Sequence, residues 1–511
     1  MIPHAPILAI VVPLLGGFLT PVISIISEKL KKKEIRSVFV LGLLSIQVLL
    51  VLNFSAQVWQ NGTVIYEVAG RTPPLGINLT IDNLGVLAAL IVSAIGYLVA
   101  IYSFFFMSPK EGQGKYYTLL FLLIAGMMGV SLTGDIFNFY VFFEIMSICS
   151  YALVSFYRDR KAIEASFKYL VMGTIGTSFL LLGIALLYGL TGTLNIADIA
   201  RRLIILEGEL GKTSFVTIAS MGLFITGLGI KIGMVPLHAW LPDSYQSAPS
   251  SISSIMAGGT AVAGVYALVR IVFMLFANLS IGTIFVGLGL VSMIVGALLA
   301  LVQKDIKRLL AYSGISQMGY ILLGIGLGAT APEAAAEIGI QGGLFHMLNN
   351  AIYKSLLFLC AGAIVYRYGT SKMEELGGIG NKMPVTTIAF VIGALALSGI
   401  PPFNGFASKW IIYMSGIESG YPYLTVIAVI VSALTLAYLL KAIGSIFLGQ
   451  TKDVEIQTKE VPIGMLIPMI ILASLCIILG IFPQLGMDVI EPAQSTLLNR
   501  LEYIEIVLGG I

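Results

Sequence analysis

The chain has 511 residues, of which 58% are hydrophobic and 11% charged, whereas soluble domains average about 45–50% and about 25%. A mean hydropathy of +0.97 places it among integral membrane proteins. Lys and Arg total 29 against 26 Asp and Glu, without a basic block, which excludes a nucleic-acid-binding surface. Cys149, Cys360 and Cys476 are isolated in apolar stretches, which excludes a disulfide scaffold, a zinc site or an iron–sulfur cluster. We therefore expect no redox centre, metal or other cofactor in this chain.

Fourteen stretches are long and apolar enough to cross a bilayer, which takes about 20 residues. Their approximate limits are 4–27, 35–54, 82–106, 116–133, 136–157, 163–190, 213–235, 251–277, 279–302, 308–329, 338–367, 384–417, 422–448 and 461–483. The first stretch lacks a basic start and a cleavage site, so it is expected to be a retained helix. The pattern predicts an all-α polytopic membrane protein with an external loop of some strand character at 55–81.

Basic residues gather in loops on one side of the predicted membrane, and Lys31, Lys32, Arg160, Lys307 and Arg308 are among them. Cytoplasmic loops are enriched in Lys and Arg because positive charge sets the orientation of the helices. We therefore expect a multi-pass protein of the cytoplasmic membrane, with both termini outside.

Several ionisable residues lie within the apolar stretches, where a charge costs at least a few kcal/mol. Glu144 is in the fifth stretch, Lys231 in the seventh, His346 and Lys354 in the eleventh, and Lys409 in the twelfth. The alternative to a functional role is a set of structural ion pairs, or, for His346, a core histidine. We favour proton transfer because burial brings the charged and neutral forms of such groups closer in free energy. A carboxylate near Lys231 would then control its proton.

Polar residues around the seventh stretch extend this set toward the cytoplasm. Lys168 lies near the cytoplasmic end of the sixth stretch, where it either reaches the headgroups or tunes the site. His238 and Asp243 follow Pro236, which breaks the helix about one turn after Lys231. These residues and the serines that follow them either hold water or form a simple helix-capping loop.

The twelfth stretch is broken in the same way. Pro401 and Pro402 free the carbonyls of residues 397 and 398. Backbone groups without partners are tolerated at membrane depth only where protein or water covers them. Two broken helices, numbers 7 and 12, each with a lysine, are typical of transporters with inverted repeats.

Three long motifs occur in order within residues 80–450. They are Lys231-Ile-Gly-Met-Val-Pro-Leu-His-Ala-Trp-Leu-Pro-Asp243 with Ser247-Ala-Pro249, then Gln303-Lys-Asp-Ile-Lys-Arg-Leu-Leu-Ala-Tyr-Ser-Gly-Ile-Ser-Gln-Met-Gly-Tyr320, then Ser398-Gly-Ile-Pro-Pro-Phe-Asn-Gly-Phe-Ala-Ser-Lys409. The motifs resemble the signatures of the antiporter-like subunits shared by Mrp-type Na+/H+ antiporters, respiratory complex I and membrane-bound hydrogenases. The resemblance implies about fourteen transmembrane helices with two inverted five-helix repeats. It divides the chain into helices 1–3 (1–106), a first repeat of helices 4–8 (107–277), a second repeat of helices 9–13 (278–448) and a C-terminal segment (449–511).

The resemblance also implies roles for the intramembrane residues. Glu144 matches the fifth-helix glutamate of the family, and Lys231 matches the seventh-helix lysine. His346 and Lys354 fall in a segment similar to the central His/Lys helix. Lys409 matches a twelfth-helix position that is lysine in some subunits and glutamate in others.

The chain departs from the family pattern at two positions. Some relatives carry histidine where this chain has Asn350, and the eighth helix usually supplies a lysine or histidine where this chain has Val262. Water, Ser253, Ser254 or Thr260 would have to bridge the resulting gap. Alternatively, the path is a half-path that ends in a neighbouring subunit.

The function implied by the resemblance is proton translocation, with Na+ as a second candidate ion, in a complex with other membrane subunits. The length is similar to the D-type Mrp subunit, and this length together with Lys409 points to Mrp antiporters or the related membrane-bound hydrogenase and sulfane reductase complexes. The Ile-rich composition, poor in Gln and Cys, is typical of thermophiles, so we favour an archaeal complex of the hydrogenase or sulfane reductase type. The partner subunits of a hydrogenase-type complex would hold iron–sulfur clusters and a nickel–iron centre. The alternatives are a stand-alone Mrp antiporter and an NADH-dehydrogenase-like complex, and, from other classes, a solute symporter or a structural scaffold.

Overall fold

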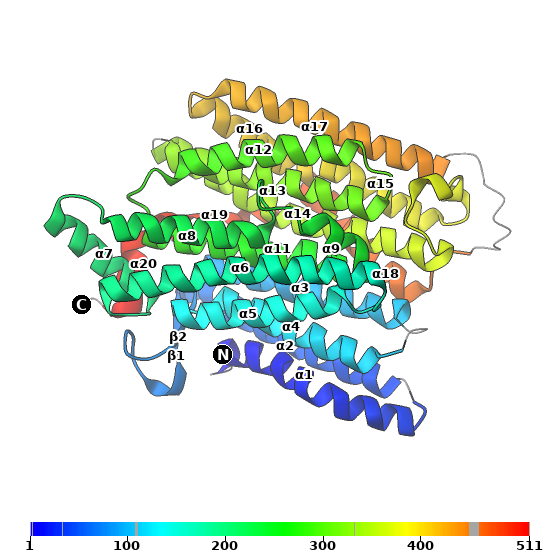
Figure 1. Cartoon of the computed structure of the whole chain (residues 1–511), viewed down its shortest axis with the longest axis horizontal. Coiled ribbons are helices and arrows are strands. Elements are labelled where there is room, and N and C mark those ends of the chain that lie inside the picture. Colours follow the sequence, from blue (N-terminus) through cyan, green and yellow to red (C-terminus); the bar gives the residue numbers. More distant parts are fainter. Residues whose placement is uncertain are drawn as a thin grey trace.

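The computed structural model describes residues 2, 4–32, 34–107, 111–331, 333–448 and 459–509, and its helices dominate the fold (Figure 1). Within this part of the chain, 13 helical spans are long and apolar enough to cross a membrane. The spans up to the first break are α1 (Ala5–Lys29), α2 (Glu34–Asn61), α3 (Asn83–Phe106), α4 (Gln113–Leu132), α5 (Ile136–Val154), α6 (Arg160–Thr191) and α8 (Phe215–Ile232). The later spans are α10 (Ser250–Ile255) joined to α11 (Ala261–Leu275) by the π-helical turn η2 (Met256–Thr260), α12 (Ile281–Leu301), α13 (Ile306–Thr330), α14 (Glu333–Tyr368), α17 (Pro422–Ile443) with the π-helical turn η5 (Gly444–Leu448), and α18 (Ile463–Ile481).

Two of the predicted stretches are broken, as the prolines indicate. The stretch 384–417 forms α15 (Pro384–Ser398) and α16 (Asn404–Glu418), each too short to span alone. Taken together they supply the fourteenth predicted crossing. The seventh stretch forms α8 and then, after the break around Pro236, the short helix α9 (Leu241–Ser247). The chain is therefore a multi-pass membrane protein with broken helices 7 and 12.

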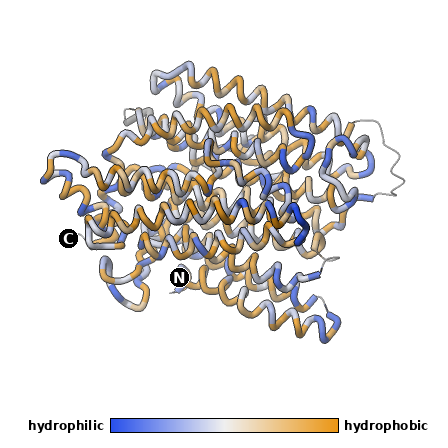
Figure 2. Tube along the Cα trace, viewed as in Figure 1, coloured by the Kyte–Doolittle hydropathy of each residue, from blue (hydrophilic) through white to orange (hydrophobic). Residues whose placement is uncertain are grey.

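The spans lie roughly side by side, and their apolar middle parts coincide in Figure 2, with hydrophilic segments at both ends of the bundle. The span formed by α10 and α11 is entirely buried, and α13 and α14 are almost as deeply buried. In contrast, fewer than half of the residues of α1, α2, α6, α12, α17 and α18 are buried. Partly exposed apolar spans fit a lipid environment, whereas α10, α11, α13 and α14 form the most deeply buried part of the bundle.

One end of the bundle carries a pair of strands and two short helices. The antiparallel strands β1 (Val64–Glu67) and β2 (Asn78–Ile81), with the short helix η1 (Val68–Gly70) after β1, confirm the predicted strand character. Three helices were not predicted, namely α7 (Ile196–Leu210), α19 (Gln484–Leu498) and α20 (Arg500–Leu508). The start of α1 lies beside β1, and the start of α20 lies beside α7. Both chain ends thus lie toward the same end of the bundle (Figure 1).

Candidate functional site

Lys231 is buried in the last turn of α8, with 6% of its surface exposed. Its Nζ donates a hydrogen bond to Ser147 Oγ of α5 at 2.8 Å. Three aromatic rings surround the amine, those of Phe143, Tyr151 and Tyr169, with centroids 5.0–5.5 Å away. A protonated lysine is attracted by ring faces, so this aromatic cage stabilises the cation without a fixed counter-charge.

Glu144 is half-buried on α5, one turn before Ser147. The sequence predicts a carboxylate that holds the proton on Lys231. Among the described residues, however, no carboxylate lies within 4.0 Å of Lys231, and Glu144 forms no ion pair. The hydroxyl of Ser147 takes the expected position of the glutamate at the amine. Any influence of Glu144 on Lys231 therefore acts over a longer distance.

His346 and Lys354 are both fully buried on α14 and both face α13, as their eight-residue spacing predicts. His346 Nε2 is 3.1 Å from Gln317 Oε1, and its Nδ1 is 2.9 Å from Ser408 Oγ of α16. Lys354 Nζ donates to the carbonyl of Leu310 at 2.8 Å and also contacts Ser313 Oγ. His346 thus connects the central helix to the residue next to Lys409.

Lys409 lies in the broken helix of the second half and is 1% exposed. Its Nζ donates to the carbonyls of Leu397 at 3.0 Å and Ser398 at 3.3 Å, which are the two carbonyls that the proline pair frees. The C-terminal end of a helix carries partial negative charge, so α15 stabilises the ammonium group. The Nζ also donates to Ser432 Oγ at 2.9 Å and lies 4.5 Å from the ring centre of Tyr320.

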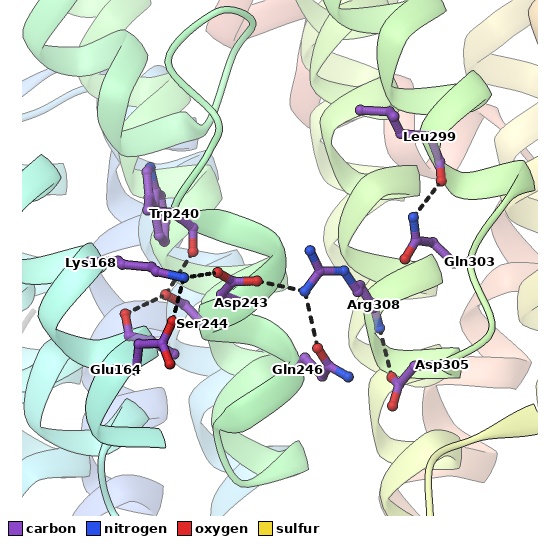
Figure 3. A network of polar contacts seen from close by, with 11 residues as sticks. Glu164, Lys168, Trp240, Asp243, Ser244, Gln246, Leu299, Gln303, Asp305 and Arg308 are labelled. Carbon is purple, nitrogen blue, oxygen red and sulfur yellow. Dashed lines mark hydrogen bonds and ion pairs between the residues drawn. The ribbon is translucent and has the colours of Figure 1, made fainter. Parts of the chain in front are cut away.

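A charged network joins α6, α9 and α13 at the end of the bundle opposite the strands (Figure 3). Lys168 pairs with Asp243 at 2.8 Å and with Glu164 at 2.8 Å. Arg308 pairs with the other oxygen of Asp243 at 2.5 Å and donates to Gln246 Oε1 at 3.2 Å. The structure therefore brings the predicted residues Lys168 and Asp243 together. It adds Arg308, which the sequence assigned only to a basic loop.

This network lines a cleft of about 730 Å³. Lys307 also lines it, is only 5% exposed, and donates to the carbonyl of Ala248 directly after α9. Sequence reasoning missed Lys307 because its position at a helix start is typical of an ordinary interfacial lysine. In the same cleft the hydrogen bond from Lys304 to Glu374, helped by their opposite charges, raises the pKa of Lys304. Lys304 therefore stays protonated at neutral pH and is not a proton carrier.

His238 lies half-buried in the break between α8 and α9. Among the described residues it forms no hydrogen bond to Lys231, Asp243 or the other predicted site residues. The structure thus does not join His238 to the rest of the predicted set.

Val262, which stands where the family resemblance implies a lysine or histidine, is buried on α11 and leaves a gap in the row of polar residues. A small cavity of about 10 Å³ is lined by residues near this gap, including Ala261, Asn350 and Lys354. Asn350 is 1% exposed, and its Oδ1 has no hydrogen-bond partner within the described part of the chain. A volume of about 10–15 Å³ accommodates one water molecule.

The serine and threonine hydroxyls expected to bridge the gap have other partners. Ser253 Oγ donates to the carbonyl of Tyr245, Ser254 Oγ to that of Ser355, and Thr260 Oγ1 to that of Met256. Asn350 is therefore the better candidate. Its signal in the sequence is an amide inside an apolar stretch, at a position where the family resemblance implies histidine in some relatives.

Comparison with protein families identifies two matching regions. Residues 133–435 match the model of the NADH:quinone oxidoreductase/Mrp antiporter transmembrane region. Residues 72–117 match the model of the N-terminus of chain 5 of NADH-ubiquinone oxidoreductase (complex I). Both α8, with Lys231, and α16, with Lys409, fall inside the first match.

Two relatives are similar to this chain over most of their length. The chain is 34% identical over 440 residues to the N-type subunit of the NADH-quinone oxidoreductase of Desulforudis audaxviator, covering 82% of this chain and 85% of the relative. It is 31% identical to the D-type subunit of the Na+/H+ antiporter of Alkalihalophilus pseudofirmus, covering 98% of this chain and 99% of the relative.

Two solved structures have the same fold. A chain of the membrane-bound sulfane sulfur reductase, an archaeal respiratory membrane complex, superposes with a TM-score of 0.89 at 33% identity, covering 99% of this chain and 100% of that chain. A chain of the Mrp complex from Dietzia sp. superposes with a TM-score of 0.88 at 26% identity, covering 99% of both.

Proposed function

We propose that this chain, which belongs to the NADH:quinone oxidoreductase/Mrp antiporter family of membrane proteins, translocates protons as one subunit of a multisubunit membrane complex, with Na+ as a second candidate ion. One observation carries the proposal. Lys231, Lys354 and Lys409 are buried within the spans, and no carboxylate lies within 4.0 Å of them among the described residues. An unpaired amine at membrane depth is costly and marks an ion path.

The order of these groups defines the proposed path. Protons from the side of the cleft reach Lys231, whose charge responds to Glu144 on the neighbouring helix. They continue to Lys354 and His346 on α14. His346 is hydrogen-bonded to Ser408, and Lys409 follows in sequence, so Lys409 receives the proton last. Release is then to the opposite side or into a neighbouring subunit. Lys168, Asp243 and His238 act at the uptake end.

One water molecule completes the path at the gap. The proposed water occupies the cavity beside Lys354 and accepts a hydrogen bond from its ammonium group. Lys354 has three N–H donors and two described partners, so one donor is available. The same water donates to Asn350 Oδ1, which has no other described partner. This arrangement replaces the eighth-helix lysine or histidine for which the chain has Val262.

We infer that the parent complex is a redox-driven complex of the hydrogenase or sulfane reductase type. The similarity to the archaeal sulfane sulfur reductase chain over its whole length supports this inference. A stand-alone Na+/H+ antiporter is the second candidate, because the relative of that name matches over 99% of its length. Mass spectrometry of partners co-purified from native membranes separates the two. Iron–sulfur and nickel–iron subunits support the first candidate, and only small membrane subunits support the second.

The roles of Lys231 and Glu144 are tested by measuring proton transport in variants of the complex. Lys231→Ala and Glu144→Ala should each abolish proton translocation by the complex in inverted membrane vesicles. The redox reaction of the partner subunits should continue in part. The control is Lys441→Gln, because Lys441 is exposed on α17 and, among the described residues, donates only to the carbonyl of Leu301. Full transport by Lys231→Ala would contradict the proposed path and favour a structural scaffold. Transport of an organic solute by the purified single chain would instead favour a symporter.

A further inference from the structure

The break that follows Lys231 is held in place by the second half of the chain. At its beginning, the backbone N–H of Val235 donates to Ser292 Oγ of α12 at 3.0 Å. At its end, Arg308 of α13 pairs with Asp243 at 2.5 Å, and Lys307 donates to the carbonyl of Ala248. Both ends of the interrupted segment are therefore attached to helices that precede Lys409 in sequence.

The same segment also forms part of the surroundings of Lys231. Trp240, directly before α9, donates its indole N–H to the carbonyl of Ile230 at 2.8 Å, one residue before the lysine. Its ring stacks on Tyr169 with centroids 3.9 Å apart and planes within 4°. Tyr169 in turn lies 5.0 Å from Lys231 Nζ. A displacement of α9 would thus move one wall of the cage around the amine.

We propose that Arg308 is a positioning residue that couples the second half of the chain to Lys231 through Asp243, α9 and Trp240. This inference rests on the proposed function, because Lys231 must carry a proton for its cage to matter. Figure 3 shows why Arg308 is suited to this role. Its guanidinium contacts both Asp243 and Gln246, which lie almost one turn apart on α9, so a single side chain holds the orientation of the helix.

The second broken helix differs from the first. Lys409 donates its hydrogen bonds to α15 and α17, and Asn404, at the start of α16, bonds to Asn349 of α14. These contacts all lie within the second half. The cross-half contacts of Val235, Asp243 and Ala248 are therefore a feature of the first break, the segment that follows Lys231.

The test uses the full complex and a readout that does not need transport. Ser247 is partly exposed in the cleft at the end of α9, and Cys149, Cys360 and Cys476 are all buried. In a Ser247→Cys variant the new thiol is therefore the accessible one of this chain, and its maleimide labelling can be followed on the separated subunit. Adding Arg308→Gln should raise the labelling rate about fivefold or more, because α9 is released from α13. Arg308→Lys keeps the charge opposite Asp243 and should restore most of the slow labelling.

The matched control is Lys304→Gln, which removes a basic side chain from the same cleft without touching α9. It should leave both labelling and transport as in the parent. The second readout is the pH profile of proton transport, which a change in stability alone would not shift. Arg308→Gln should slow transport and shift its pH optimum. Unchanged labelling, or a pH profile like that of Lys304→Gln, would overturn the inference.

The two proposals can fail separately. If Lys231→Ala retains transport, the proposed function fails, whereas labelling of Ser247→Cys still reports whether Arg308 holds α9. If Lys231→Ala abolishes transport but Arg308→Gln changes neither readout, only the coupling role of Arg308 is wrong.

Discussion

Lys409 shows how a broken helix stabilises a buried cation. Its ammonium group donates to two carbonyls at the C-terminal end of α15, where the backbone already carries partial negative charge. The helix end thus takes the place of a counter-ion. A helix end does not ionise, so it cannot take up the proton of Lys409 as a carboxylate would. The other contacts of the ammonium group among the described residues are with Tyr320 and Ser432.

This geometry predicts an order of stability among substitutions at Lys409. Lys409→Glu would place a carboxylate against carbonyl oxygens, so it should destabilise the complex more than Lys409→Gln, whose amide can still donate to one carbonyl. Each unsatisfied buried group costs about 1–3 kcal/mol. Thermal unfolding of the purified complex measures the difference, with Lys441→Glu on an exposed surface as the control. Equal stability of the two Lys409 variants would contradict the assignment.

Asn350 provides the second prediction at this scale. Asn350→Leu fills the cavity beside Lys354 and removes the amide, so it should slow proton translocation about tenfold, since about 1–3 kcal/mol of hydrogen bonding to the relayed proton is lost. Asn350→His should retain transport because an imidazole can relay protons directly. Both rates are measured in vesicles with equal amounts of assembled complex. Normal rates for Asn350→Leu would show that the path bypasses this cavity.

At the scale of elements, the end of α15 is set by Gly399, which has φ of +78°. A side chain here is strained, and a Cβ atom would lie 2.7 Å from Cδ of Lys409. Gly420, after α16, has φ of +80° but nothing within 4 Å of the corresponding Cβ position. The two glycines therefore separate backbone strain from displacement of the lysine.

We expect Gly399→Ala and Gly420→Ala to lose similar stability from backbone strain, on the order of 1 kcal/mol each. Only Gly399→Ala should also reduce proton transport, because the new methyl group pushes Lys409 away from the carbonyls of α15. Thermal unfolding and transport are measured on the same preparations. A loss of transport in both variants, in proportion to their stability, would show that displacement of Lys409 is unimportant.

At the scale of the whole molecule, hydropathy and proline positions were sufficient to predict the spans and both breaks. They also placed Lys231, Lys354 and Lys409 inside apolar stretches, and all three lysines are buried. The sequence could not reveal that Ser147 rather than Glu144 contacts Lys231, since both lie on the same helix within one turn. It also missed Lys307 and Arg308, because long side chains at helix ends look alike whether they reach water or fold back onto a neighbouring helix.

The helices α7, α19 and α20 were missed for a related reason. Hydropathy detects long apolar runs, whereas these helices have only 15, 15 and 9 residues and bury one face each, so they contain no such run. The inverted relation of the two five-helix groups and the division of the chain at 107, 278 and 449 stay predictions.

Sidedness is the remaining prediction for the whole molecule, and it determines the direction of transport. We expect the end with β1 and β2 to lie outside the cell and the cleft to open to the cytoplasm, because most basic loops lie at the cleft end. Leu75, which is 91% exposed between the strands, and Lys372, exposed in the cleft, mark the two ends. An impermeant maleimide applied to intact cells should label Leu75→Cys but not Lys372→Cys, and inverted vesicles should give the opposite result. The reverse pattern would place the uptake of protons at Lys231 on the outer side, and the order Lys231, Lys354, Lys409 would then describe inward movement.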